Sequence, residues 1–248
     1  RARLDDPAAL RGVTGAAEAY LAAYQAANGS AGFGNVRDFV LDSIAGLDAV
    51  TVAPDGALTI GAMARQRDLE RDATVARHCP LMVEALGQVG HRQTRNRGTI
   101  GGSLCHLDPA AELPLVAAAS DAVLVAIGPK GRREMPFADF AQGFMTTALE
   151  AEELLVAVRL PPLPAGAGCC FLEFARRHGD FAIVAVAVTL LPDAAGRIAE
   201  ARIALGGVGA VPLRLPAAEA ALRGATPDAF AQAVAATGQV LMHRFFCR

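Results

Sequence analysis

The chain has 248 residues, 53% of them hydrophobic, a composition that allows a sizeable core and excludes a disordered protein. Its formal net charge is −2, with 23 Lys and Arg against 25 Asp and Glu, so nothing in the charge indicates nucleic-acid binding. Apolar runs such as 113–119 and 181–191 are shorter than the roughly 20 residues that a membrane-spanning helix needs.

The five cysteines contain no CxxC pair, and the first residues lead into no apolar stretch of the kind that a secretory signal has. An odd number of cysteines without that spacing predicts neither a disulfide framework nor a zinc site. We therefore expect a cytoplasmic protein without a metal site.

In chain order, residues 7–27 are rich in alanine with apolar residues at helical spacing, which predicts one or two short helices. Residues 36–44 fit a strand or a helix equally well. A hairpin is expected over 50–62, because a Pro-Asp-Gly turn separates two alternating segments. Two helices should follow, over 66–78 and 81–90, with Cys79-Pro80 as their boundary.

The middle of the chain is expected to form a helix, a two-stranded hairpin, a short helix and a strand, over 112–119, 121–136, 137–144 and 153–160. Pro and Gly then alternate with small residues up to 168, which predicts a boundary between two domains, 1–165 and 169–248. Three β-leaning segments and two helices follow, over 169–176, 182–191, 198–205, 215–222 and 228–240. This order predicts an α+β fold in two parts, the second a three-stranded sheet with helices.

Gly98, Gly101 and Gly102 lie close together between the helices expected at 81–90 and 112–119. Glycines leave backbone N–H groups unobstructed and permit positive φ, so a pyrophosphate could sit against this main chain, beside the hydroxyls of Thr99 and Ser103. A tight loop without a ligand is the alternative. The spacing is not that of a Rossmann fingerprint.

The longer segment from Arg95 to Pro114 reads RNRGTIGGSLCHLDPAAELP. It resembles the second flavin-binding segment of the FAD-binding medium subunits of molybdenum hydroxylases, the group of aerobic carbon monoxide dehydrogenase and xanthine dehydrogenase. Residues 44–47, 58–62, 174–182 and 204–214 are similar to other landmarks of that family. The resemblance covers roughly 44–240 and leaves both ends of the chain atypical.

This resemblance implies a two-part FAD-binding domain of the vanillyl-alcohol-oxidase/molybdopterin-dehydrogenase type, followed by a small α+β domain of the carbon monoxide dehydrogenase flavoprotein type. Glu112 falls where the family usually has Asp as a polar FAD contact, and Leu155 matches an apolar contact. Phe181 matches a side chain that covers the isoalloxazine ring, although a core aromatic on a buried strand is equally open. The turn that holds the FAD pyrophosphate matches Thr99, Ile100, Gly101, Gly102 and Ser103, the last in place of the usual Asn.

The implied function is that of an oxidoreductase subunit that transfers electrons. Substrate would be oxidised at molybdenum on a large molybdopterin-binding subunit, and a small 2Fe-2S subunit would pass the electrons to FAD and on to NAD or a quinone-type acceptor. These subunits are expected to form a dimer of heterotrimers. No residue here is a strong candidate for a general acid or base, so the chemistry would belong to the cofactor.

The sequence departs from the family where a first Gly-rich segment is expected, near 21–25, and 28–34 is the only local substitute. Either this loop has moved, or half of the pyrophosphate cradle is missing. The end of the chain, 241–248, differs as well, and we interpret both departures as a truncated or frame-disrupted gene product. A degenerate, FAD-free paralogue with only a structural role is the main alternative, ahead of a self-contained flavin oxidase.

Overall fold

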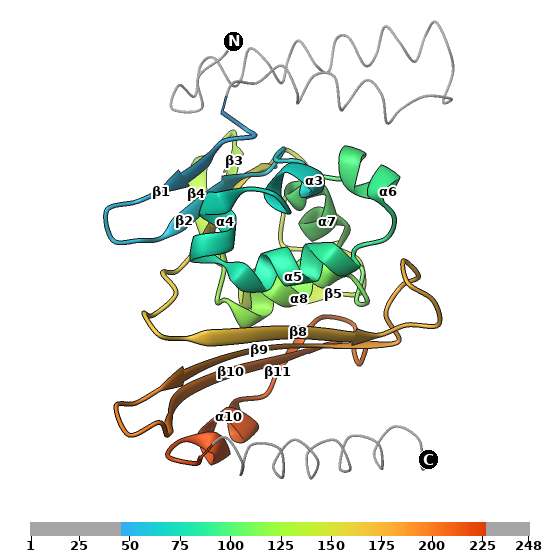
Figure 1. Cartoon of the computed structure of the whole chain (residues 1–248). Helices are drawn as coiled ribbons and strands as arrows, with labels where there is room; N and C mark the ends of the chain where they lie inside the picture. The colour runs from blue at the N-terminus through green and yellow to red at the C-terminus, as the bar shows by residue number, and fades with distance from the viewer. Residues whose placement is uncertain (1–45, 227–248) are drawn as a thin grey trace, which may run out of the picture.

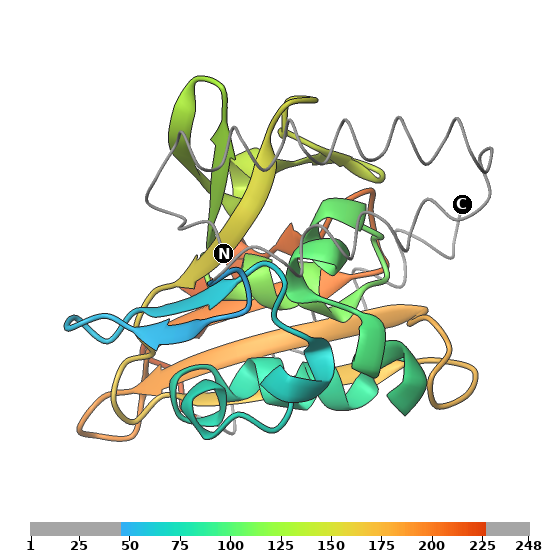
Figure 2. The ribbon, with the colours of Figure 1, turned by 90° about the horizontal axis from the view of Figure 1, so that it is seen from above.

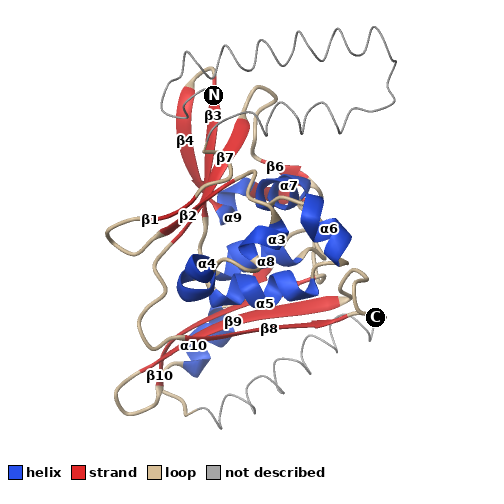
Figure 3. Cartoon of the chain, turned by 45° about the horizontal axis from the view of Figure 1, so that its top comes forward, coloured by secondary structure: helices blue, strands red, loops and turns tan. Residues whose placement is uncertain are grey.

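Figure 1 shows the chain as a computed structural model in which residues 46–226 are described. The helices predicted over 7–27 and 228–240, the loop 28–34 and the undecided segment 36–44 lie outside these residues. In the described part, a group of helices lies between two larger antiparallel sheets (Figure 3).

The first sheet, sheet A, has the strand order β1-β2-β7-β3-β4. Its strands are β1 (Val50–Val52), β2 (Leu58–Gly61), β7 (Leu154–Leu160), β3 (Val123–Gly128) and β4 (Gly131–Pro136). The predicted hairpin over 50–62 is confirmed, since β1 pairs with β2 and Gly56 adopts a φ of 87°, which costs a glycine little. Seen from above, the hairpin of β3 and β4 stands away from the long strands of the second sheet (Figure 2).

The helix predicted over 66–78 forms as two helices, α3 (Gln66–Leu69) and α4 (Ala73–His78). The helix is interrupted before Asp72, whose carboxylate accepts hydrogen bonds from the N–H groups of Thr74 and Val75 at 2.6 and 3.1 Å. These bonds cap a new helix start and compete with continuation of the first helix. Helix α5 (Pro80–Gln88) follows and confirms the predicted boundary at Cys79-Pro80.

Helix α8 (Glu112–Ala119) has the predicted bounds, and all of its 8 residues are buried. The short helix expected over 137–144 covers only α9 (Phe137–Phe140), because the chain then turns into a small hairpin of β5 (Ala141–Gly143) and β6 (Thr146–Thr147). Within residues 46–226, no helix has the length and apolar character that crossing a membrane requires.

The second sheet, sheet B, has the order β11-β10-β9-β8. The three predicted strands form as β8 (Gly168–Phe174), β9 (Val184–Pro192) and β10 (Ile198–Gly206), and a strand of 2 residues, β11 (Leu213–Arg214), adds a fourth. Helices α5 and α8 pack on one face, and α10 (Pro216–Leu222) packs against β10 on the other (Figure 1).

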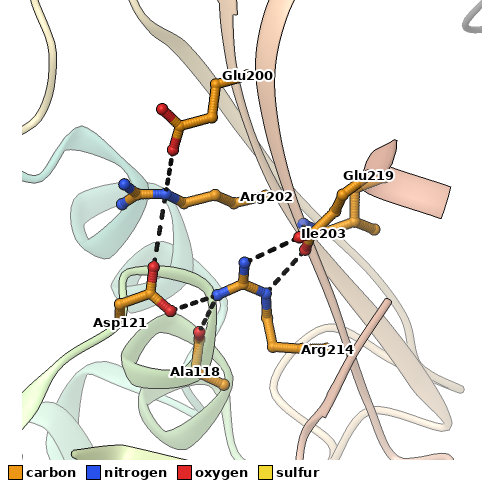
Figure 4. Close-up of polar contacts among 7 residues, drawn as sticks. All are labelled: Ala118, Asp121, Glu200, Arg202, Ile203, Arg214 and Glu219. Atoms are coloured by element: carbon orange, nitrogen blue, oxygen red, sulfur yellow. Dashed lines mark hydrogen bonds and ion pairs between the residues drawn. The ribbon is translucent and has the colours of Figure 1, made fainter. Parts of the chain in front are cut away.

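Buried side chains of both sheets belong to one apolar core around α5 and α8. Polar contacts add to it at the end of α8 (Figure 4). Arg214 donates to the carbonyl oxygen of Ala118 at 3.0 Å and to the carboxylate of Asp121 at 2.6 Å. Its guanidinium also binds Glu219 of α10, which in turn accepts from the N–H of Ile203. This polar cluster fixes sheet B and α10 to the end of α8.

Candidate functional site

The glycine-rich segment is helical. Helix α6 (Arg92–Arg97) ends just before Gly98, and α7 (Ile100–His106) begins just after it, with Thr99 as its N-cap. None of Gly98, Gly101 and Gly102 has positive φ, so the segment does not use the positive φ that glycine permits. Gly98 and Thr99 form a tight connection between the two helices, as the alternative interpretation has it, but Gly101 and Gly102 lie within α7.

These glycines are explained by close packing. A Cβ atom at Gly101 would lie 2.6 Å from the Cβ of Ala62, and one at Gly102 would lie 2.9 Å from the Thr99 hydroxyl oxygen. At Gly98 the added atom would lie 2.5 Å from the side-chain oxygen of Gln66. Helix α7 can therefore approach the chain that leaves β2 only because Gly101 has no side chain.

The backbone N–H groups of residues 100–103 are already engaged, so the expectation that the glycines leave them unobstructed is wrong. The two groups nearest to β2 bind carbonyl oxygens of the residues that follow it, and the next two are capped by Thr99. The donors are Ile100 to Ala64 O (3.1 Å), Gly101 to Ala62 O (2.8 Å), Gly102 to Thr99 Oγ1 (3.0 Å) and Ser103 to Thr99 O (3.2 Å).

The side chains of Thr99, Ser103 and Arg65 offer groups that fit a phosphate-bearing cofactor. The Thr99 hydroxyl accepts from Gly102 and keeps its own proton to donate, and Ser103 is only half-buried. Arg65 forms an isolated bridge with Thr99, and its guanidinium donates to the carbonyl oxygen of Arg97. An arginine whose backbone pairs with Thr99, together with two hydroxyls in the segment, suits the negative charge of a pyrophosphate.

Gln66 offers a second observation at the same place. Its side chain is buried against Gly98, and its amide oxygen has no hydrogen-bond partner within the described structure. A buried acceptor without a donor is unusual in folded proteins. Gln66 could not be singled out from the sequence, because its close approach to Gly98 is a tertiary contact.

Glu112 begins α8 and is 8% exposed. Burial raises the pKa of its carboxyl from 4.5 to about 7, against the hydrogen bond from its own N–H, and the nearby carboxylates of Glu173 and Asp108 raise it further, while Arg95 lowers it. Near neutral pH this group can donate as well as accept a hydrogen bond. The family's Asp contact would thus be replaced by a longer, partly protonated acid.

Glu173 was missed at the sequence level. It lies on β8 two positions after the buried Phe171, so strand alternation points it to the same inner face. Its Oε2 atom is buried without a hydrogen-bond partner among the described residues, and burial raises its pKa while His178 lowers it. The alternation of residues along β8 was the sequence signal that could have placed Glu173 on the inner face.

The other two predicted residues lie in contrasting surroundings. Leu155 on β7 is buried in the main core, and β7 and α8 both pack against α7, which brings together the elements of Leu155, Glu112 and Thr99. Phe181 lies in the turn between β8 and β9 and is 71% exposed. The alternative that Phe181 is a core aromatic on a buried strand is therefore wrong.

Comparisons with known proteins agree with this architecture. The family model described as FAD binding domain in molybdopterin dehydrogenase matches residues 39–163, and the model of the CO dehydrogenase flavoprotein C-terminal domain matches residues 170–245. The first match covers half of the chain, so this protein belongs to the family of FAD-binding domains of molybdopterin dehydrogenases. The family resemblance and the fold class predicted from the sequence are confirmed.

Particular relatives are subunits of dehydrogenase complexes. The 6-hydroxypseudooxynicotine dehydrogenase complex subunit alpha of Paenarthrobacter nicotinovorans is 41% identical over 165 residues, which cover 66% of this chain and 56% of that protein. The chain thus spans little more than half the length of this curated relative.

Two solved structures show the same fold. Carbon monoxide dehydrogenase from Hydrogenophaga pseudoflava, in a form that lacks the Mo-pyranopterin moiety, is 37% identical with a TM-score of 0.72, covering 76% of this chain and 66% of that one. Quinoline 2-oxidoreductase from Pseudomonas putida 86 is 36% identical with a TM-score of 0.73, covering 78% and 67%.

Proposed function

We propose that this chain binds FAD and serves as the electron-transferring medium subunit of a molybdenum hydroxylase. The family match over residues 39–163 is the observation that carries the proposal. Its partners would be a large molybdopterin-binding subunit and a small 2Fe-2S subunit, in a dimer of heterotrimers, with NAD or a quinone as electron acceptor. The named dehydrogenase relatives support this assignment.

In this proposal the residues of the chain bind and orient the cofactor. The hydroxyls of Thr99 and Ser103 hold the pyrophosphate, and the segment Thr99–Ser103 acts through these side chains because the N–H groups of residues 100–103 are engaged. Glu112 offers a polar contact, and Leu155 an apolar one. When bound, FAD supplies the redox chemistry, and Phe181 excludes water from its ring.

A specific observation favours a second candidate. The N–H groups of residues 100–103 all donate to oxygens of the protein. A pyrophosphate would therefore gain no free backbone donor there, which weakens binding compared with an open cradle. The second candidate is a structural subunit of the same kind of complex that holds no flavin.

A visible spectrum of the purified chain separates the two candidates. Bound flavin absorbs at about 450 nm. The main proposal predicts this band in the purified chain, or in the chain after incubation with FAD and removal of the unbound excess by gel filtration. A colourless chain that takes up no FAD would leave only the structural subunit.

A further inference from the structure

The turn between β8 and β9, residues 175–183, carries Phe181 and is anchored unevenly. At its end, Ala182 is buried in the core, and the N–H of Ile183 donates to the carbonyl oxygen of Phe174 at 2.8 Å. The first half, Arg176 to His178, is exposed, and so is Phe181. The position of Phe181 therefore depends on what holds the middle of the turn.

Gly179, in the middle of the turn, lies against His91. A Cβ atom at Gly179 would be 2.6 Å from Cε1 and 2.8 Å from Nδ1 of the His91 ring, and 3.4 Å from the carbonyl carbon of Gly90. Gly179 also has a φ of 90°, a conformation that other residues adopt only with strain. The turn can thus reach the His91 ring because Gly179 has no side chain.

The backbone at His91 is firmly placed, while its side chain is exposed and makes no capping hydrogen bond. His91 is the N-cap residue of α6, the helix that leads directly into Gly98 and Thr99. The buried guanidinium of Arg95 donates to the carbonyl oxygens of Val89 and Gly90 at 2.7 and 3.2 Å and binds Glu70 at 3.0 Å. Arg95 of α6 therefore fixes the backbone just before His91.

We propose that His91 is a positioning residue: its ring holds the β8–β9 turn against α6 and so sets Phe181 relative to the segment Thr99–Ser103. This inference rests on the proposed function, since it assigns Phe181 to the flavin ring. It adds a residue that joins the two halves of the site, because α6 continues into one half and the turn carries the other.

Hydrogen–deuterium exchange on the full chain without FAD tests the contact directly. We expect His91→Ala to speed exchange in residues 175–183 by about tenfold and to leave the turn at 193–197 unchanged. His91→Phe keeps a flat ring and should stay near the wild-type rate. Gly179→Ala should loosen the same turn, because its methyl group displaces the ring.

The double variant His91→Ala with Gly179→Ala is the decisive comparison. Removing the ring makes room for the methyl group, so its exchange should be no faster than that of Gly179→Ala alone, which carries the same strain from positive φ. Gly196→Ala is the matched control, since Gly196 has a φ of 74° and open space at its Cβ position. It should disturb only its own turn.

FAD affinity provides the second measurement. His91→Ala and Phe181→Ala should each weaken FAD binding, and the combined variant should bind no more weakly than Phe181→Ala alone. Unchanged exchange in 175–183 on His91→Ala, or simple addition of the two single effects, would overturn the inference. If the wild-type chain takes up no FAD, the proposed function fails, but the exchange result still decides whether His91 holds the turn.

Discussion

At the scale of single residues, Thr99 has two tasks that a mutation can separate. Its hydroxyl caps α7 through the bond to the Gly102 N–H, and it is a proposed phosphate donor. Thr99→Ala should lower the free energy of unfolding by about 1 kcal/mol, and Thr99→Ser should restore it. Urea unfolding of the FAD-free variants measures this effect. Equal stability of Thr99→Ala and wild type would show that the cap contributes nothing.

The raised pKa of Glu112 implies that the free energy of unfolding depends on pH. Its pKa is about 7 in the folded chain and close to its ordinary 4.5 in the unfolded chain, so the folded state binds more protons between these values. The stability that this group contributes is therefore fully present below pH 4.5 and falls by about 3 kcal/mol as the pH rises to 7.

Glu112→Gln removes this titration without changing the size of the side chain. The difference in unfolding free energy between variant and wild type should grow in favour of the variant from pH 4.5 to 7, as measured by urea unfolding at several pH values. A constant difference across this range would mean that Glu112 ionises as an exposed acid does.

At the scale of elements, the packing of α7 explains its glycines. Gly101→Ala places a methyl group against Ala62, and we expect a loss of about 1–3 kcal/mol in unfolding free energy, seen as a lower melting temperature. Gly87→Ala in α5 is the control, because nothing lies within 4 Å of its Cβ position. That change should stabilise the chain by about 0.5–1 kcal/mol. If both substitutions raise the unfolding free energy, α7 does not pack as closely against Ala62 as described.

The polar cluster around Arg214 makes a second prediction at this scale. Arg214→Ala should cost about 2 kcal/mol, because it leaves the Glu219 carboxylate, with a side chain 15% exposed, without its cation. Arg132→Ala is the matched control, since Arg132 binds Glu134 on the surface, and its cost should stay within about 0.5 kcal/mol. Thermal unfolding compares them, and equal losses would argue against a special role for the cluster.

Elements with local signals could be predicted from the sequence. The Pro-Asp-Gly turn marked the β1–β2 hairpin, and α8 began and ended at the predicted residues. The break at Asp72 was missed, because a side-chain cap competed with an apolar pattern that suited one longer helix. Helix α7 was missed because its glycines oppose helix formation locally and are explained only by the approach to Ala62.

At the scale of the whole molecule, the family was accessible from the resemblance of residues 95–114 to a known motif and the fold class from the order of the predicted elements, while the hydrogen bonding of the site was not. The residues Thr99 to Ser103 could be named from their resemblance. The N–H groups of Ile100 and Gly101 donate to carbonyl oxygens about 40 residues earlier in the chain, at Ala64 and Ala62. The exposure of Phe181 likewise follows from the turn geometry of sheet B and not from the strand pattern.

Calorimetric titration of FAD into the full chain tests the central claim, that this chain holds FAD through the side chains of Thr99 and Ser103. We predict saturable binding of a single FAD, weakened at least about tenfold in the double variant Thr99→Ala with Ser103→Ala. Riboflavin, which lacks the phosphates, should bind both proteins equally. No uptake of FAD by the wild type, or equal FAD affinity in the double variant, would contradict the account.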